Sequence, residues 1–348
     1  MAPRRPSERV ISRAISLAAP LTIALGLTSR VAQADPSTTS IEQGYDLGTI
    51  QSPREMAFGG AQTALGTSTT ALYNNPANLP LASVYHFEGL AAFSPEARRQ
   101  SYGGAVVDSS TSKLAGGLAG TLNSLDPDGI HRTWTDVRLG IAYPLGDRFS
   151  VGGTLRYLRG NQGVTTGPLG GTTGPFTALT GTNDLSSDGL AGGPIVNLMT
   201  FDAGMTLIPA EGFRIGAVGH NLTNPGSGFA PTTFQGGVGY TTDLFSVETD
   251  AMADFTTYKS TAGRYMAGGE LFLGGHVPLR AGYRYDDGTR THSVSGGLGY
   301  IATQWSFEAS VRQDVVSEHP NTMIGISLRF FYGAAGSNGS VDTSNEAF

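Results

Sequence analysis

The sequence has no cysteine among its 348 residues, which excludes disulfide bonds and metal sites built on thiolates. Charged residues make up only 14% of the chain, fewer than a soluble globular protein usually carries. No apolar run long enough for a membrane-spanning helix follows residue 34. Proline is sparse, at 18 residues, whereas glycine is abundant, at 50. This composition argues against a proline-rich linker and against a collagen-like repeat.

Residues 1–34 have the features of a secretory signal peptide. A basic start with Arg4, Arg5, Arg9 and Arg13 precedes the mostly apolar stretch 14–27, and Ala32-Gln33-Ala34 fits the small-residue cleavage rule. A short membrane anchor is the alternative interpretation. Removal of this segment would leave 17 basic and 27 acidic residues, an excess of negative charge that argues against a nucleic-acid partner.

Residues 83–332 repeat one pattern: about ten residues of alternating apolar and polar character, followed by a turn. In Val277–Asp286 the residues Val277, Leu279, Ala281, Tyr283 and Tyr285 fall on one face, and Arg280 and Arg284 fall on the other. Alternation of this kind is typical of a β-strand with one apolar surface. We therefore predict an all-β fold, a 14-stranded antiparallel transmembrane β-barrel of the bacterial outer-membrane type. The predicted strands are 84–93, 101–108, 113–123, 132–144, 148–158, 198–208, 212–221, 233–241, 245–255, 264–273, 277–286, 290–301, 304–313 and 322–332.

The lengths of the connections support this topology. Connections after even-numbered strands are short, as at Gly146-Asp147, and several after odd-numbered strands are longer, as at 222–232. Outer-membrane barrels have short periplasmic turns and longer external loops. The longest connection, 159–197, is rich in Gly and Thr, and we expect a functional or mobile external loop there.

The segment 35–82 lacks sustained alternation. Its short helix-tolerant pieces and turns predict a small N-terminal plug, or hatch, with helical and irregular structure. A barrel of fourteen strands has a lumen that wall side chains alone do not fill, and this segment is the available material. Residues 333–348 form a polar tail that we expect to be disordered.

Several motifs resemble the FadL superfamily of outer-membrane transporters for hydrophobic compounds. The resemblance begins with Gly59–Leu65, Ala71–Tyr73 and the Asn75-Pro76-Ala77 turn, which is similar to the hatch of that family. It continues in pieces closer to a PorV-like branch associated with protein secretion and surface attachment: Phe201–Pro209, Gly216–Leu222, Gly268–Leu271 and Pro278–Tyr283. The resemblance implies fourteen strands, an N-terminal plug and passive transport through the plugged lumen.

The candidate site residues lie on the polar faces of the strands. A guanidinium could bind a fatty-acid carboxylate, or it could pair with acids of the lumen. Apolar residues on the same faces could line a channel or pack against the plug. The Asn-Pro-Ala turn could anchor the plug or be only a local turn. The ligand or lumen candidates are Arg138, Arg156, Arg214, Arg280, Arg284, Met252, Met266 and Phe272; Arg312, Val218 and Ile208 share these faces, and the hatch motif is Asn75, Pro76 and Ala77.

The sequence predicts no enzyme, with no catalytic residues, no cofactor and no metal site. Asp126-Pro-Asp-Gly129 offers only two carboxylates, so a plain turn is favoured over a Ca²⁺ site. The six histidines lack ligand spacing, and Gly296–Gly299 sits inside a strand pattern rather than before a helix.

The predicted function is passive transport of small hydrophobic compounds, either long-chain fatty acids or aromatics. The expected partners are outer-membrane lipid and a hydrophobic small molecule. The alternative is a PorV-like role in secretion or surface attachment of a partner protein, and a general porin is a third possibility.

Overall fold

The computed structural model describes residues 50–125, 131–162, 194–225, 229–258, 260–318 and 320–332. The predicted signal peptide and tail lie outside these ranges, as do residues 35–49 of the predicted plug, most of the 159–197 connection and the Asp126–Gly129 turn. Within the described ranges, no helix is long and apolar enough to cross a membrane.

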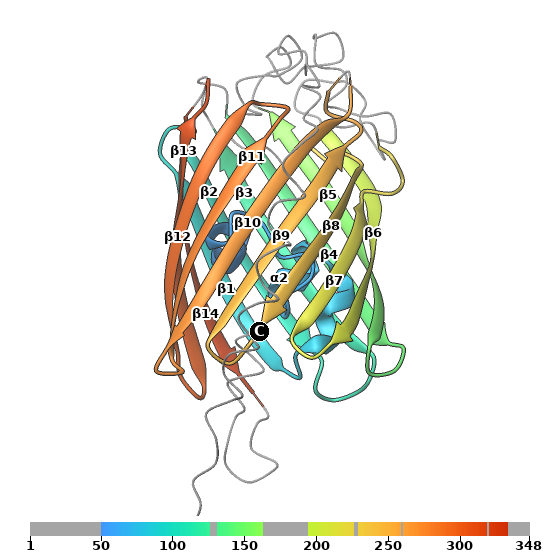
Figure 1. Cartoon of the computed structure of the whole chain (residues 1–348). Helices are drawn as coiled ribbons and strands as arrows, with labels where there is room; N and C mark the ends of the chain where they lie inside the picture. Colours follow the sequence, from blue (N-terminus) through green and yellow to red (C-terminus); the bar gives the residue numbers. More distant parts are fainter. Residues whose placement is uncertain are drawn as a thin grey trace, which may run out of the picture. The chain divides into compact units, whose positions relative to one another are not determined.

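Fourteen antiparallel strands form a closed barrel (Figure 1). Each strand pairs with the next in sequence, and β1 closes the ring against β14 through pairs such as Phe87 with Phe330. Closure leaves no strand edge exposed to lipid, where an unpaired backbone group would find no hydrogen-bond partner. The strands are β1 (Tyr85–Ser94), β2 (Arg99–Asp108), β3 (Ala115–Leu125), β4 (Arg132–Pro144), β5 (Phe149–Gln162), β6 (Pro194–Ala210), β7 (Phe213–His220), β8 (Thr233–Thr241), β9 (Phe245–Asp254), β10 (Ala262–Leu273), β11 (Val277–Asp286), β12 (Thr291–Ile301), β13 (Trp305–Val316) and β14 (Thr322–Phe331).

The predicted strands are confirmed in number, order and face. The predicted bounds of β4, β8 and β11 match the structure, whereas β5 and β6 continue further into the region predicted as a loop. Asn161 still pairs with Pro194 there. The prediction ended these strands too early because it assigned all of the Gly- and Thr-rich residues 159–197 to one connection.

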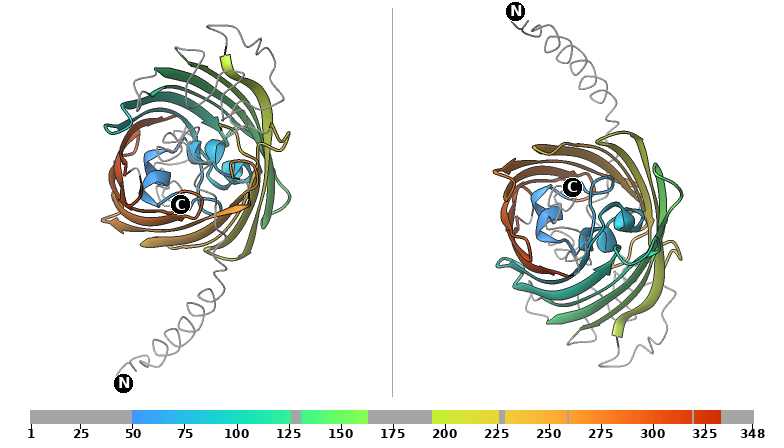
Figure 2. Two further views of the ribbon diagram at one scale, coloured as in Figure 1. Left: turned by 90° about the horizontal axis from the view of Figure 1, so that it is seen from above. Right: turned by 90° about the horizontal axis from the view of Figure 1, so that it is seen from below.

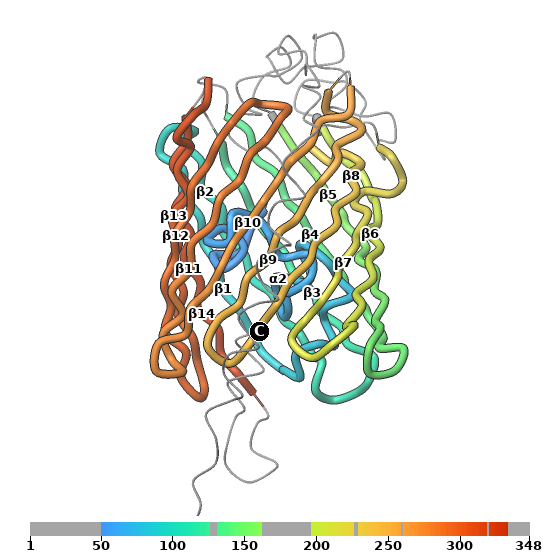
Figure 3. The backbone as a smooth tube through the Cα atoms, in the orientation of Figure 1, coloured from blue at the N-terminus to red at the C-terminus, as the bar shows by residue number. Residues whose placement is uncertain are grey.

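Side chains alternate between an apolar outer face and a polar inner face. On β4, Leu139 and Ile141 are half exposed on the outside, while Asp136 and Arg138 are buried on the inside. The short connections gather at one end of the barrel, the lower end in Figure 3, and the connections after odd-numbered strands lie at the other. The predicted difference between the two ends is therefore present in the structure.

Residues 50–82, here called the inner segment, lie inside the ring of strands (Figure 2). The segment contains α1 (Pro53–Ala57), α2 (Thr69–Tyr73) and the 3-10 helix η3 (Pro76–Leu81). The side chain of Ser52 accepts a hydrogen bond from the Glu55 N–H and caps α1, and Asn75 caps η3 in the same way through the Ala77 N–H. Helices this short depend on packing against their surroundings.

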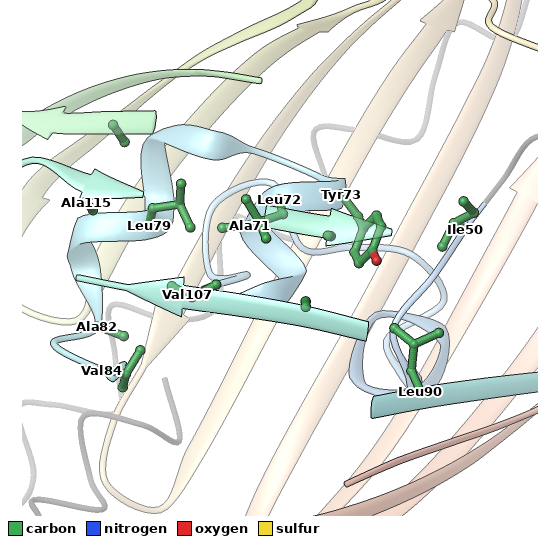
Figure 4. Close-up of a cluster of buried hydrophobic side chains, with 13 residues drawn as sticks. Ile50, Ala71, Leu72, Tyr73, Leu79, Ala82, Val84, Leu90, Val107 and Ala115 are labelled. Atoms are coloured by element: carbon green, nitrogen blue, oxygen red, sulfur yellow. The ribbon is translucent and has the colours of Figure 1, made fainter. Parts of the chain in front are cut away.

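The inner segment is fixed to the wall by apolar packing and by close backbone contact. Leu72, Tyr73 and Leu79 join wall residues such as Val107 in one buried cluster (Figure 4). Wall glycines permit a closer approach: a Cβ atom at Gly152 would lie 2.6 Å from the carbonyl carbon of Pro76, and one at Gly268 would lie 2.6 Å from the carbonyl oxygen of Phe58. Side chains at these positions would push the inner segment away from the strands.

Candidate functional site

A cavity of about 160 Å³ lies between the inner segment and the barrel wall. Glu55, Tyr73 and Asn74 contribute to it from the inner segment. The wall contributes polar residues from β4, β5 and β6 and two methionines, Met252 on β9 and Met266 on β10. The cavity therefore has a polar side and an apolar side, an arrangement typical of small-molecule sites.

The polar side is built on two arginines that neighbouring strands place next to each other. Arg138 on β4 lies directly opposite Arg156 on β5 in the strand pairing. Asp136 lies 3.0 Å from Arg138 Nε and 2.5 Å from Arg156 Nη2, so one carboxylate binds both guanidinium groups. Asp202 on β6 lies 3.9 Å from Arg138 and 3.2 Å from His220 Nδ1. The guanidinium groups predicted to bind a ligand carboxylate are therefore already bound to carboxylates of the wall.

Glu55 adds a buried carboxyl group from α1. Its Oε1 accepts a hydrogen bond from Gln51 Nε2 at 3.3 Å, and no ion pair within the described ranges includes it. Burial raises the pKa of Glu55 to about 7, because the lost hydration outweighs the hydrogen bonds of Gln51 and Asn74 and the charges of Arg138 and Arg312. The carboxyl therefore exchanges its proton near neutral pH, unlike an ordinary surface glutamate.

A second group of apolar residues lies inside the barrel, towards the end with the long connections. Trp134, Leu158 and Leu198 point inward from β4, β5 and β6, and their rings and methyl groups pack with Phe229. Phe229 also lines the cavity, so the group borders the candidate site. The full set, here called the apolar cluster, is Ala97, Leu125, Trp134, Leu158, Val196, Leu198, Phe229 and Ala230.

The apolar cluster was not among the residues predicted from the sequence to form the site. Its signal is present in the sequence, since Trp134 precedes Asp136 and Arg138 by even steps and Leu158 follows Arg156 by two. Large apolar residues in register with lumen arginines indicate that the polar face becomes apolar near the end of the barrel.

The other predicted arginines lie outside this cavity. Arg280 belongs to a buried ion network that joins Arg54 of α1 to the wall, through Glu270 at 2.5 Å and Glu308 at 2.8 Å. Arg284 is buried on the inner face of β11, and Arg214 lies near the start of β7. Phe272 packs with Ile301 in a separate small cluster. The structure thus brings together Arg138, Arg156, Met252 and Met266, four of the eight predicted residues.

Asn75 of the predicted hatch motif joins the inner segment to β6. Its Nδ2 donates to the Thr63 carbonyl at 2.8 Å and to Thr206 Oγ1 at 3.0 Å, while its Oδ1 caps η3. Pro76 opens η3 and Ala77 donates the capping hydrogen bond. The motif therefore sets a local turn and also contacts the wall, so both interpretations considered for it describe part of its geometry.

A pair of carboxylates on β9 binds the backbone of residues 62–65. Asp250 Oδ2 accepts from the N–H groups of Gln62 and Thr63, both at 3.0 Å. Glu248 accepts from the N–H groups of Ala64 at 2.5 Å and Leu65 at 3.1 Å. Acids of the lumen were expected as arginine partners, but these two accept hydrogen bonds from the backbone of the inner segment.

An apolar groove of about 710 Å³ lies at the wall formed by β5 to β8. Small residues such as Ala203, Ala217 and Gly236 form its floor, and Met205 and Phe234 flank it on the outer face. Gln235 belongs to the linings of both this groove and the cavity. At Gln235 the cavity and the groove are therefore separated only by the barrel wall.

Comparison of structures relates this architecture to known channels. The toluene transporter TbuX of Ralstonia pickettii matches 83% of this chain and all of its own chain, with a TM-score of 0.58 at 15% identity. The monoaromatic hydrocarbon channel CymD matches 81% of this chain and 97% of its own, with a TM-score of 0.56 at 16% identity. A FadL homologue of Pseudomonas aeruginosa matches 81% and 98%, with a TM-score of 0.52 at 10% identity.

The chain has the FadL-type barrel fold. Identities of 10–16% show a common architecture and no more. No protein-family model and no curated protein matches the sequence. The fold expected from the Asn-Pro-Ala turn and the strand count is thus confirmed by structure.

No group of three His, Asp or Glu side chains that could hold a metal ion occurs within the described ranges of this FadL-type barrel. His220 pairs with Asp202, and His276 lies 3.0 Å from the Ile301 carbonyl.

Proposed function

We propose that the protein is a passive outer-membrane channel for small hydrophobic compounds. The observation that carries the proposal is the lumen: residues 50–82 fill it, and a cavity remains beside an apolar cluster near the end with the long connections. The similarity in fold to TbuX and CymD, a toluene transporter and a monoaromatic hydrocarbon channel, supports the same class of cargo.

In this proposal the segment 35–82 is the plug of the channel and residues 83–332 are its wall. A compound enters at the end with the long connections, crosses the apolar cluster and occupies the cavity. The residues that contact it there include Arg138, Arg156, Met252 and Met266. The free energy of an apolar compound falls when it leaves water for the apolar cluster, so its entry requires no energy source.

The apolar groove at β5 to β8 offers an exit towards lipid. Its lining is almost entirely apolar, and Gln235 is shared with the cavity. An Ala217→Phe substitution would fill the groove and should slow release without changing binding in the lumen. Ala281→Phe is the matched control, because Ala281 is exposed on the outer face of β11, away from the groove.

Uptake into vesicles tests the proposal as a whole. Vesicles with lipopolysaccharide in the outer leaflet limit background permeation, and labelled toluene and a labelled long-chain fatty acid are the probes. Faster uptake of either probe with the protein than without it supports the proposal. If neither probe enters faster with the protein than without it, the proposal is contradicted.

The secretion-related role remains a prediction from sequence resemblance. The structures compared above are those of small-molecule channels or of a FadL homologue, and they give no support to a secreted protein partner. A secreted protein retained at stoichiometric amounts by the purified barrel would reopen that alternative.

A further inference from the structure

The charges around the cavity do not favour an anionic ligand. Each of the three arginines in the lining has a carboxylate within 3.0 Å: Asp136 for Arg138 and Arg156, and Asp286 for Arg264. The lining itself contains four acids, Glu55, Asp202, Asp254 and Asp286. A ligand carboxylate would have to displace a wall carboxylate from its arginine and would still face the remaining acids.

The inner segment supplies polar groups that lack partners. Tyr73 Oη, Asn74 Oδ1 and Glu55 Oε2 have no hydrogen-bond partner among the described residues, and each of these side chains is at least 94% buried. All three residues line the cavity. Buried polar groups are normally hydrogen-bonded, so this side of the cavity suits a ligand with a hydroxyl or amino group.

The opposite side of the cavity suits an aromatic ring. Met252 and Met266 come from adjacent strands, and Phe229 belongs to the apolar cluster. Thioether sulfur makes favourable contacts with aromatic rings. The volume of about 160 Å³ is close to that of a dry protein cavity that holds benzene, about 150 Å³. The space thus accommodates one ring with a small substituent and is too small for an extended acyl chain.

We propose that this cavity selects neutral single-ring aromatic molecules that carry a hydroxyl or amino group, and rejects aromatic carboxylates. This assignment rests on the proposed transport function and narrows its cargo to the phenol and aniline class. The Glu55 carboxyl can serve such a ligand in both protonation states, because it accepts from a hydroxyl when ionised and donates to it when protonated.

Binding to the purified full-length protein in detergent tests the assignment. The probes are toluene, phenol and benzoate, which share one ring and differ in the substituent. Trp134 reports on the site, since its ring centroid lies 6.2 Å from that of Phe229, and Trp305→Phe removes the other tryptophan from the signal. We expect phenol to bind at least about tenfold more tightly than toluene or benzoate. Benzoate binding as tight as phenol binding, or tighter, would overturn the proposal.

Two substitutions at Glu55 separate its polar role from its charge. Glu55→Leu should reduce the preference for phenol over toluene to less than about threefold. Glu55→Gln keeps a donor and an acceptor in the same volume, so the phenol preference should persist while benzoate binding tightens severalfold. If benzoate binds Glu55→Gln no more tightly than it binds the wild type, the charge of Glu55 does not exclude carboxylates. This result is informative even if Glu55→Leu does not fold. Glu211→Gln is the control, because Glu211 is an exposed acid in the turn between β6 and β7.

The binding and uptake measurements fail in different ways. If all three probes bind equally and the vesicles take up toluene, the channel function stands and the selectivity proposal is wrong. If phenol binds selectively but no probe enters the vesicles faster with the protein, the site assignment stands and the transport function is wrong.

Discussion

Two regions of the inner segment are attached to the barrel wall by opposite electrostatic means. Around α1, Arg54, Arg280 and Arg329 alternate with Glu270, Glu308 and Glu88 at distances of 2.5–3.2 Å. Residues 62–65 are held instead by Glu248 and Asp250, whose described partners are backbone N–H groups, the side chains of Thr63 and Gln235, and each other.

The difference lies in what compensates the buried charge. In the α1 network each carboxylate has an arginine partner, so three positive and three negative charges balance. At residues 62–65 two carboxylates lie on the same face of one strand and are compensated mainly by dipoles. Opposite charges attract at any moderate pH, whereas neighbouring carboxylates repel each other when both are ionised. The attachment of residues 62–65 to the wall is therefore expected to be weaker than that of α1.

Loss of the central arginine of the α1 network should have the largest effect. Arg280→Met leaves Glu270 and Glu308 without their shared partner, a change that typically costs about 3–5 kcal/mol in a buried network. Hydrogen exchange of the Phe58 and Gly60 amides measures the opening of α1, because both bond to carbonyls of this helix. The exposed Arg148 provides the control Arg148→Met. Equal protection of α1 in the two variants would show that the network does not hold it.

Removal of one carboxylate from β9 should have a smaller and local effect. Asp250→Ala leaves the N–H groups of Gln62 and Thr63 without their acceptor, at about 1–3 kcal/mol for a buried unsatisfied group. Exchange of these two amides should accelerate about 10- to 100-fold while the α1 amides keep their protection. Asp243→Ala, at an exposed turn, is the matched control. Simultaneous loss of protection in both regions would show that the two attachments open as one unit.

The sequence predicted the wall far better than the contents of the lumen. Alternation in Val277–Asp286 identifies the strand and its two faces, because a strand of such a barrel has apolar surroundings on one side and polar surroundings on the other along its whole length. No comparable sequence pattern specifies which residues meet inside the lumen. The sequence placed Arg138 and Arg280 on equivalent faces, yet Arg138 borders the cavity, whereas Arg280 binds Glu270, the carboxylate that also binds Arg54 of α1. Which acid each arginine meets depends on strand register and on the path of residues 50–82, neither of which alternation encodes.

The candidate site shows the same limit. Met252 and Met266 were identifiable because they interrupt polar faces, whereas Glu55 lies in a segment without periodicity. Its significance comes from burial beside the cavity, which only the three-dimensional structure reveals. Trp134 and Leu158 lay on predicted strands and could have been found by extending the face analysis to the strand ends.

Glu55 belongs to α1, yet it takes no part in the balanced ion network that attaches this helix to the wall. The charged or titratable groups around it are Arg54 on its own helix, Arg138 and Arg312 on the wall, and Tyr73 on α2. Its pKa of about 7 in the folded protein exceeds the ordinary value for glutamate, so between these values the folded chain keeps a proton that the unfolded chain has lost. The stabilisation is complete below the ordinary pKa and disappears as the pH rises through about 7.

The unfolding free energy should therefore fall between about pH 5 and pH 7, with a contribution from Glu55 of at most about 1.4 kcal/mol per pH unit. Glu55→Gln removes this titration. The difference in unfolding free energy between wild type and variant, measured by guanidinium unfolding, should therefore change with pH inside that window and stay constant outside it. The Glu211→Gln control should show no such difference. A wild-type curve parallel to that of Glu55→Gln from pH 5 to pH 8 would mean that Glu55 keeps an ordinary pKa, and hence that water reaches the carboxyl despite its burial.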